Sequence, residues 1–150
     1  MKKINYKFFV FSRNFYLSNL ISILLLLIGC QYVSYFDSIS YKNLTDLKGE
    51  MKVAFQSFAE NGAKGEEDFK VIENFKIESS KGYEYEKGKN KNDDTIAQWK
   101  IIDSLIIETV QRFKSQNNEL SAGYCEAKWE ILETAFDIAI ATENGKLSEK

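Results

Sequence analysis

The chain of 150 residues contains no histidine, no proline and only two cysteines. The absence of histidine excludes the Ser-His-Asp and Cys-His catalytic arrangements, together with sites in which histidine binds zinc or haem. The Glu-x-x-His motif of di-iron helical bundles is excluded for the same reason. Without proline, no ring clash interrupts a helix anywhere in the chain. These absences favour a helical protein that is not an enzyme, and neither a cofactor nor a bound metal is expected.

Long hydrophobic runs are also missing. The longest apolar stretch, Leu20–Ile28, has nine residues and includes Ser22. A membrane-spanning helix needs about 20 such residues. Four basic residues precede the stretch, namely Lys2, Lys3, Lys7 and Arg13. A short apolar segment behind a basic region is typical of a cleaved secretory signal peptide.

The tetrapeptide Leu27-Ile28-Gly29-Cys30 that ends this stretch resembles the lipobox of bacterial lipoproteins. The resemblance covers residues 1–30 only. It implies that Cys30 receives a diacylglyceryl group and that cleavage falls between Gly29 and Cys30, so that residues 1–29 are a signal peptide. An uncleaved signal anchor, or a buried N-terminal helix with an incidental cysteine, is the alternative.

The residue that follows the lipobox suggests a location. In lipoproteins of bacteria with two membranes, aspartate after the cysteine commonly retains the protein in the inner membrane, whereas this chain has Gln31. The resemblance therefore implies a protein anchored in the outer membrane and facing the periplasm. For a source with a single membrane, this inference does not apply.

Charge excludes one class of partner. Cleavage after residue 29 removes four basic residues and no acidic one, which takes the formal net charge from −2 to −6. Nucleic-acid binding is not expected, because phosphate backbones are bound by clusters of lysine and arginine. The 121 residues that remain are enough for one domain with its own core.

Apolar residues at helical spacing predict four amphipathic helices. Their expected ranges are 41–60, 66–87, 93–114 and 121–143, with turns between them that contain glycine or asparagine. Four such helices joined by short loops predict an all-α fold, an antiparallel four-helix bundle with up-down-up-down topology. The bundle is expected over residues 41–145, and residues 146–150 are expected to fray.

Three features of the chain around this bundle are expected. Residues 30–40 form an aromatic connector that packs on the domain or lies at lipid headgroups, and therefore keeps the domain near the membrane. If Cys30 carries lipid, Cys125 has no partner within the chain and is expected to be a small buried apolar residue, with pairing between two copies as the alternative. Ile131 and Ile138 are expected on the buried side of the fourth helix.

Four carboxylates follow one another along the fourth helix at spacings of four, three and four residues: Glu126, Glu130, Glu133 and Asp137. This spacing places them on one side of the helix, where they repel one another unless something compensates. Three interpretations stay open. The row docks a basic partner, binds a divalent cation, or is a solvated face paired with lysines of a neighbouring helix.

Two other groups of residues are candidates. Asp103 and Lys128 interrupt apolar faces of neighbouring helices and are expected to form a structural charge pair, the alternative being a desolvated reactive lysine. Tyr83 and Tyr85 lie in a segment with exposed lysines and are expected to offer a second contact surface for a partner, or simply a helix end.

Taken together, these features predict a small lipid-anchored envelope protein that acts by protein–protein contact, in an adaptor, inhibitor or immunity-type role. Its expected partners are the membrane, through lipid on Cys30, and another envelope protein. The alternative is a helical binding module for a divalent cation or a small apolar ligand.

Overall fold

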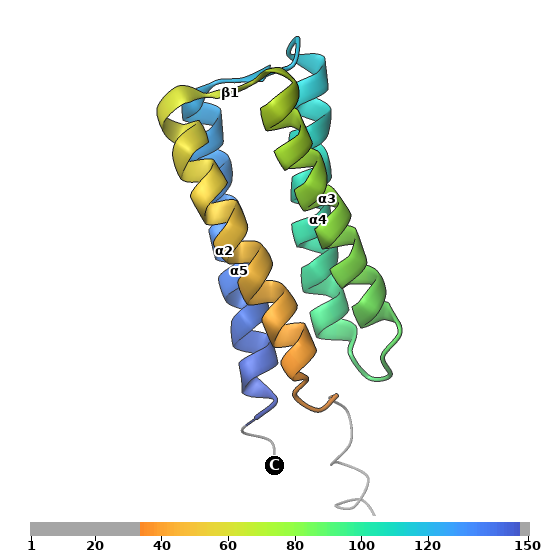
Figure 1. The fold of residues 1–150 in the computed structure, drawn as a ribbon. Helices are drawn as coiled ribbons and strands as arrows, with labels where there is room; N and C mark the ends of the chain where they lie inside the picture. Colours follow the sequence, from red (N-terminus) through yellow and green to blue (C-terminus); the bar gives the residue numbers. More distant parts are fainter. Residues whose placement is uncertain (1–33, 148–150) are drawn as a thin grey trace, which may run out of the picture. The chain divides into compact units, whose positions relative to one another are not determined.

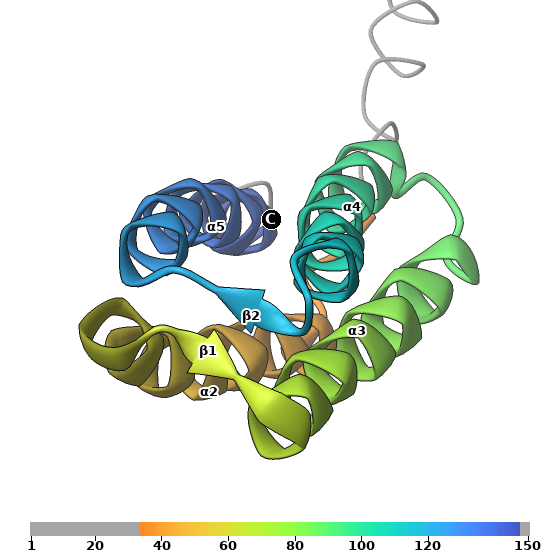
Figure 2. The same cartoon turned by 90° about the horizontal axis from the view of Figure 1, so that it is seen from above.

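The computed structural model describes residues 34–147, so the predicted signal peptide, Gly29, Cys30 and the start of the connector lie outside the described residues. Within them the chain forms α2 (Ser38–Asn61), α3 (Gly65–Lys87), α4 (Asp93–Ser115) and α5 (Ala122–Gly145) (Figure 1). Successive helices run in opposite directions and follow one another around a ring (Figure 2). The predicted antiparallel up-down-up-down bundle is confirmed.

Side-chain caps explain where two of the helices begin. The Asp37 carboxylate accepts a hydrogen bond from the Ile39 amide at 2.8 Å, so α2 begins at Ser38, three residues before the predicted start. Residues 38–40, assigned to the connector from sequence, therefore belong to the helix. Ser121 caps α5 in the same way and accepts from the Tyr124 amide at 3.3 Å. None of the helices within residues 34–147 is both long and apolar enough to cross a membrane.

Two very short strands connect the helix pairs at one end of the bundle, which we call the distal end. β1 (Ala63–Lys64) pairs antiparallel with β2 (Glu119–Leu120), and Ala63 and Leu120 face each other in the register. Both side chains are buried, so they cover the distal end of the core. Gly62 before β1 has a φ of 70°, and a Cβ there would lie 2.8 Å from the Leu120 carbonyl oxygen. The end of α2, predicted at residue 60 before a turn that contains glycine or asparagine, is thus fixed by both backbone conformation and space.

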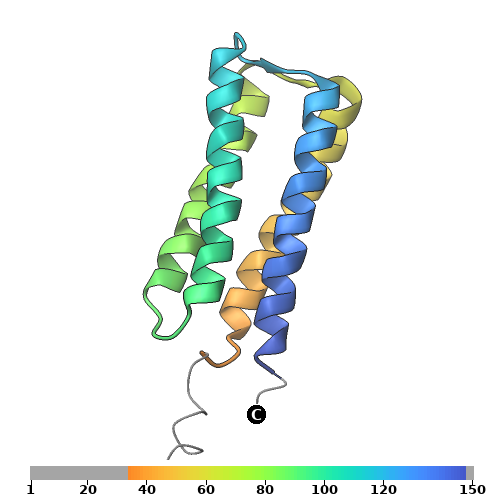
Figure 3. The ribbon, with the colours of Figure 1, turned by 180° about the vertical axis from the view of Figure 1, so that it is seen from behind.

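The core lies between two helix pairs, α2 with α5 and α3 with α4 (Figures 1 and 3). Aromatic rings pack against each other between the two helices of each pair. Phe55 of α2 packs on Trp129 of α5 with ring centroids 6.0 Å apart, and Phe69 of α3 stacks on Phe113 of α4 at 5.4 Å. The largest fully buried side chain is Trp99 of α4, which is 1% exposed.

Cys125 is fully buried on α5 and forms no disulfide, which confirms the expectation of a small buried residue. Burial raises the pKa of the Cys125 thiol to about 11, although contact with the Ala63 backbone opposes the shift. At pH 8 this pKa leaves about one hundredth of the thiolate that an ordinary cysteine would have.

We expect alkylation of Cys125 by iodoacetamide at pH 8 to be limited by unfolding, because the native thiol is both covered and protonated. The rate should rise with urea in parallel with loss of the helical circular-dichroism signal. Native protein that is alkylated as fast as free cysteine would contradict the buried position.

The raised pKa of Cys125 also affects stability. Because the thiol loses its proton more readily in the unfolded chain than in the fold, the free energy of unfolding should fall as pH rises from about 9 towards 11.

Candidate functional site

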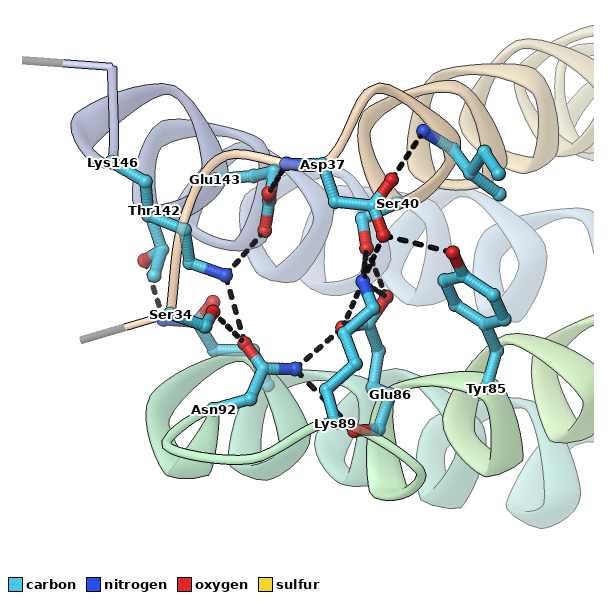
Figure 4. Close-up of polar contacts among 12 residues, drawn as sticks. Ser34, Asp37, Ser40, Tyr85, Glu86, Lys89, Asn92, Thr142, Glu143 and Lys146 are labelled. Carbon is cyan, nitrogen blue, oxygen red and sulfur yellow. Dashed lines mark hydrogen bonds and ion pairs between the residues drawn. The ribbon is translucent and has the colours of Figure 1, made fainter.

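A network of polar and charged side chains lies at the proximal end of the bundle, where the described chain begins (Figure 4). Its members come from the connector, the start of α2, the end of α3, the α3–α4 turn and the end of α5. We call it the Glu86–Glu143 network; it consists of Ser34, Asp37, Ser40, Tyr85, Glu86, Lys89, Asn92, Glu143 and Lys146. Glu86 and Glu143 are fully buried, and Lys146 is 5% exposed. Charged groups at such positions are costly unless they are paired.

Glu86 joins the end of α3 to the start of α2. Its carboxylate accepts hydrogen bonds from the Ser40 hydroxyl and, at 2.5 Å, from the side-chain amide of Asn92. The ammonium of Lys89 lies 3.1 Å from the same carboxylate and 2.6 Å from that of Asp37. Lys89 therefore bridges a carboxylate of α3 and the carboxylate that caps α2.

Glu143 joins the end of α5 to the connector. Its carboxylate accepts from the Asp37 amide at 2.7 Å and pairs with Lys146 at 2.6 Å. Lys146 also donates to the Asn92 side-chain oxygen at 2.8 Å, and the Ser34 hydroxyl donates to that oxygen at 2.9 Å. Lys146, the first residue of the segment expected to fray, is thus held within the fold. The connector from Ser34 onwards is fixed to the bundle.

Asp37 carries the clearest electrostatic signature of the network. Partial burial alone would raise the pKa of Asp37, but hydrogen bonds from Lys89, Tyr85 and the Ile39 amide outweigh burial and lower this pKa to about 2. The hydrogen bond that Tyr85 donates to Asp37 raises the pKa of the Tyr85 phenol, and burial adds to that shift.

These shifts predict a loss of stability in acid. The pKa of Asp37 is 3.8 in the unfolded chain and about 2 in the fold, so between these values the unfolded chain binds a proton that the folded chain does not. Stability contributed by Asp37 is therefore present above pH 4 and is lost as pH falls towards 2. The free energy of unfolding, measured with urea at several pH values, should depend less steeply on pH in Asp37→Asn than in the wild type. Equal slopes in the two proteins would contradict the assignment.

The tyrosines predicted as a contact surface both lie in the last turns of α3, within the predicted helix 66–87. Tyr85 is 38% exposed, and its hydroxyl donates to Asp37 at 2.8 Å, so it is part of the Glu86–Glu143 network. Tyr83 is half-buried against the core, with the Lys87 ammonium 5.2 Å from its ring centroid. Both side chains have structural contacts that a partner would have to disturb.

The predicted pair between Asp103 and Lys128 is not formed. Lys128, 5% exposed, donates to Glu108 of α4 at 2.7 Å. Asp103 accepts from Ser79 and Ser80 of α3 at 2.7 and 2.9 Å. Asp103 lies on the side of α4 that faces α3. Lys128 contacts α4 from α5, on the other side of the buried face of α4. Each charge therefore has a nearer partner than the other.

The acidic row on α5 is neutralised along only half of its length. Asp137 pairs with Lys48 of α2 at 2.5 Å, and Glu133 lies 3.7 Å from Lys52. Glu126 and Glu130, nearer the distal end, are exposed and form no ion pair among the described residues. Within residues 34–147 no three acidic, histidine or cysteine side chains converge to hold a metal ion.

Two isoleucines of α5 that were predicted to face the core lie on the surface. Ile131 and Ile138 are 53% and 54% exposed. They belong to a run of exposed, uncharged residues at alternating spacings of four and three, which we call the α5 seam: Ala127, Ile131, Thr134, Ile138 and Ala141. At 100° per residue the seam is turned by about 90° from the acidic row. An uncharged face and an acidic face thus border each other along α5.

The far edge of the seam is formed by α4, which lies beside α5 (Figure 3). The Gln98 amide of α4 donates to the Thr142 hydroxyl of α5 at 2.7 Å. Ile101 is 54% exposed on this side, and Ala97 and Ser104 are exposed next to it. The edge beside α4 is therefore uncharged around Ile101, and towards the distal end it carries Glu108, whose charge is paired with Lys128 of α5.

A groove of about 460 Å³ lies between α2 and α3. Leu47, Gly82 and Trp99 lie among its lining residues, and all three are buried. The charged lining residues are Asp46, Glu50, Glu78 and Lys81. The Asp46 carboxylate already pairs with Lys42, and Glu78 pairs with Lys81 at 2.7 Å.

Comparison of the chain with protein-family models, curated proteins and solved structures found no match.

Proposed function

We propose that this chain is a small envelope protein, held to a membrane by lipid on Cys30, which acts by binding another protein. The observation that carries the proposal is the α5 seam, an exposed row of aliphatic and small residues that spans four turns of one helix. Contiguous exposed apolar surface of this kind marks interaction sites. An adaptor, inhibitor or immunity-type role fits a protein that offers a surface and performs no catalysis.

The position of the predicted lipid supports this proposal. Three residues separate Cys30 from Ser34, the first described residue, and Ser34 is hydrogen-bonded to the α3–α4 turn. A fully extended chain spans at most about 14 Å over the four steps from residue 30 to residue 34. A lipid on Cys30 would therefore keep the bundle close to the membrane surface, where its partner would also have to lie.

Site-specific photocrosslinking in intact cells tests the contact. A photoreactive amino acid at position 131 lies on the α5 seam, and the same group at position 53 is a matched control because Val53 is an exposed aliphatic residue of α2, 70% exposed. We expect a discrete crosslinked species from position 131 and none from position 53. Equal labelling from both positions, or none from position 131, would count against a partner on α5.

The groove between α2 and α3 favours a second candidate, a binding module for a small ligand. Its carboxylate rim and buried apolar floor would suit a cation with a hydrophobic part. Ligands that bind only the folded state raise the unfolding temperature. Thermal unfolding with calcium chloride or benzyltrimethylammonium, repeated on Glu50→Gln, separates the candidates. The contact proposal predicts no shift from either probe.

A further inference from the structure

We infer that the partner of this protein presents an α-helix, with an uncharged seam that packs on α5 and a row of lysines or arginines along one edge only. The inference rests on the proposed function and names the chemistry of the partner. It follows from the juxtaposition of the α5 seam with the acidic row, and from the uneven neutralisation of that row.

The spacing of the seam fits a helical partner. Exposed residues at alternating steps of four and three are the pattern by which two helices pack along a common seam. From Ala127 to Ala141 the seam is about 21 Å long at 1.5 Å per residue, enough for four turns of a partner helix. Alanine at both ends and β-branched residues between them permit close approach of a second backbone. The central position, Thr134, already uses its hydroxyl on the Glu130 carbonyl at 2.9 Å, so it presents its methyl group.

The two edges of the seam differ in charge, and this difference determines the orientation of the partner. One edge is the acidic row, and the other is the surface of α4, which is uncharged around Ile101 and whose Glu108 is already paired with Lys128. Lys48 and Lys52 neutralise the proximal half of the row, whereas Glu126 and Glu130 in the distal half form no ion pair within residues 34–147. The basic residues of the partner should therefore meet the distal half, and its opposite edge should be uncharged.

The same charges disfavour two other occupants. A second copy packed antiparallel along the seam would set one acidic row against the other, because a two-fold axis brings equivalent edges together. A parallel copy would set the row against the uncharged edge of α4 and leave Glu126 and Glu130 without a counter-charge. An anionic lipid surface would be repelled by those carboxylates.

Binding of synthetic helical peptides to the folded protein, followed by fluorescence anisotropy, tests the inference. The probes are three peptides of three heptads each: one with an Ala/Ile seam and a lysine edge, one with the same seam and a glutamate edge, and one with the lysine edge and a serine seam. We expect the first to bind and the other two to bind at least about tenfold more weakly. The Ile131→Ser/Ile138→Ser variant is altered only at exposed positions, and its affinity for the first peptide should be about tenfold lower than that of the wild type.

A matched pair of variants tests which half of the acidic row meets the basic residues of the partner. Glu126→Gln/Glu130→Gln should weaken binding of the lysine-edged peptide several-fold. Glu133→Gln/Asp137→Gln removes the same charge where α2 already neutralises it, and should have a smaller effect. Equal affinity of the lysine-edged peptide for wild type and the isoleucine variant would overturn the inference. So would sedimentation as a dimer that the isoleucine variant abolishes, or binding to phosphatidylglycerol vesicles through the same isoleucines.

Failure of this inference can be told apart from failure of the proposed function. A crosslink from position 131 to a protein segment without a basic-edged helix would reject the partner chemistry but keep the contact role. The absence of any crosslink from position 131 would reject the contact role itself.

Discussion

Replacing Glu86 with alanine should destabilise the protein by about 3 kcal/mol, the lower end of the range for removing one partner of a buried ion pair. Glu86 is fully buried and accepts hydrogen bonds from Ser40 and Asn92 as well as from Lys89. Its removal leaves the Ser40 hydroxyl and the Asn92 side-chain amide without this carboxylate as acceptor inside the fold. The cost stays at the lower end because Lys89 keeps its contact with Asp37 at 2.6 Å.

Glu84 provides the control for this experiment. It lies two residues earlier on the same helix and pairs with Lys87 at 2.8 Å, but its side chain is 66% exposed. Glu84→Ala should change the free energy of unfolding by no more than about 0.5 kcal/mol. Urea unfolding of both variants measures the difference. Equal effects at the two positions would show that the Glu86–Glu143 network does not exist in solution.

The second large effect is expected at Gly82, where alanine should destabilise by about 1–3 kcal/mol, as overpacking of a core does. A Cβ at this position would lie 2.2 Å from Cη2 and 2.3 Å from Cζ3 of Trp99. The indole is 1% exposed and packs in the core, so avoiding the Cβ would require it to shift from this packing towards the groove that it lines. The steric cost has to exceed the helix propensity of alanine, which by itself favours the substitution by about 1 kcal/mol.

A substitution at Gly49 separates the steric cost of a Cβ from the helix propensity of alanine. It lies within α2, and a Cβ there would meet nothing within 4 Å. Gly49→Ala should therefore stabilise the protein by about 0.5–1 kcal/mol. In a Trp99→Phe background, where the ring atoms nearest Gly82 are gone, Gly82→Ala should lose most of its penalty. If Gly82→Ala stabilised the wild type as Gly49→Ala does, the packing of Trp99 against α3 would be wrong.

The sequence was sufficient to predict the four helices, because each has a polar side and ends at glycine, asparagine or a charged turn. The stop at Gly62 and the buried Cys125 could be predicted for the same local reasons. The strands β1 and β2 could not, because two residues carry no periodic signal. The core face of α5 was misjudged at Ile131 and Ile138. That helix is apolar around much of its circumference, so only the positions of α2 and α4 decide which side is covered.

The Glu86–Glu143 network was not predicted from sequence at all. Glu86 and Glu143 each stand near the end of a helix, where a glutamate ordinarily lies in water. Their partners come from segments up to 106 positions away, as in the contact between Asp37 and Glu143. Only the tertiary arrangement brings these segments together. The Asp103–Lys128 pairing failed for the related reason that spacing along a helix does not fix which neighbour a charge faces.

The measurement that tests the account most directly is mass spectrometry of the N-terminus of protein extracted from bacterial membranes, with Cys30→Ser alongside. We expect Cys30 to be the first residue and to carry a diacylglyceryl group, and we expect the variant to keep residues 1–29. Protein that retains residues 1–29 and has a free thiol at Cys30 would contradict the lipid anchor. The proposed envelope location, and the partner expected there, would then be lost with it.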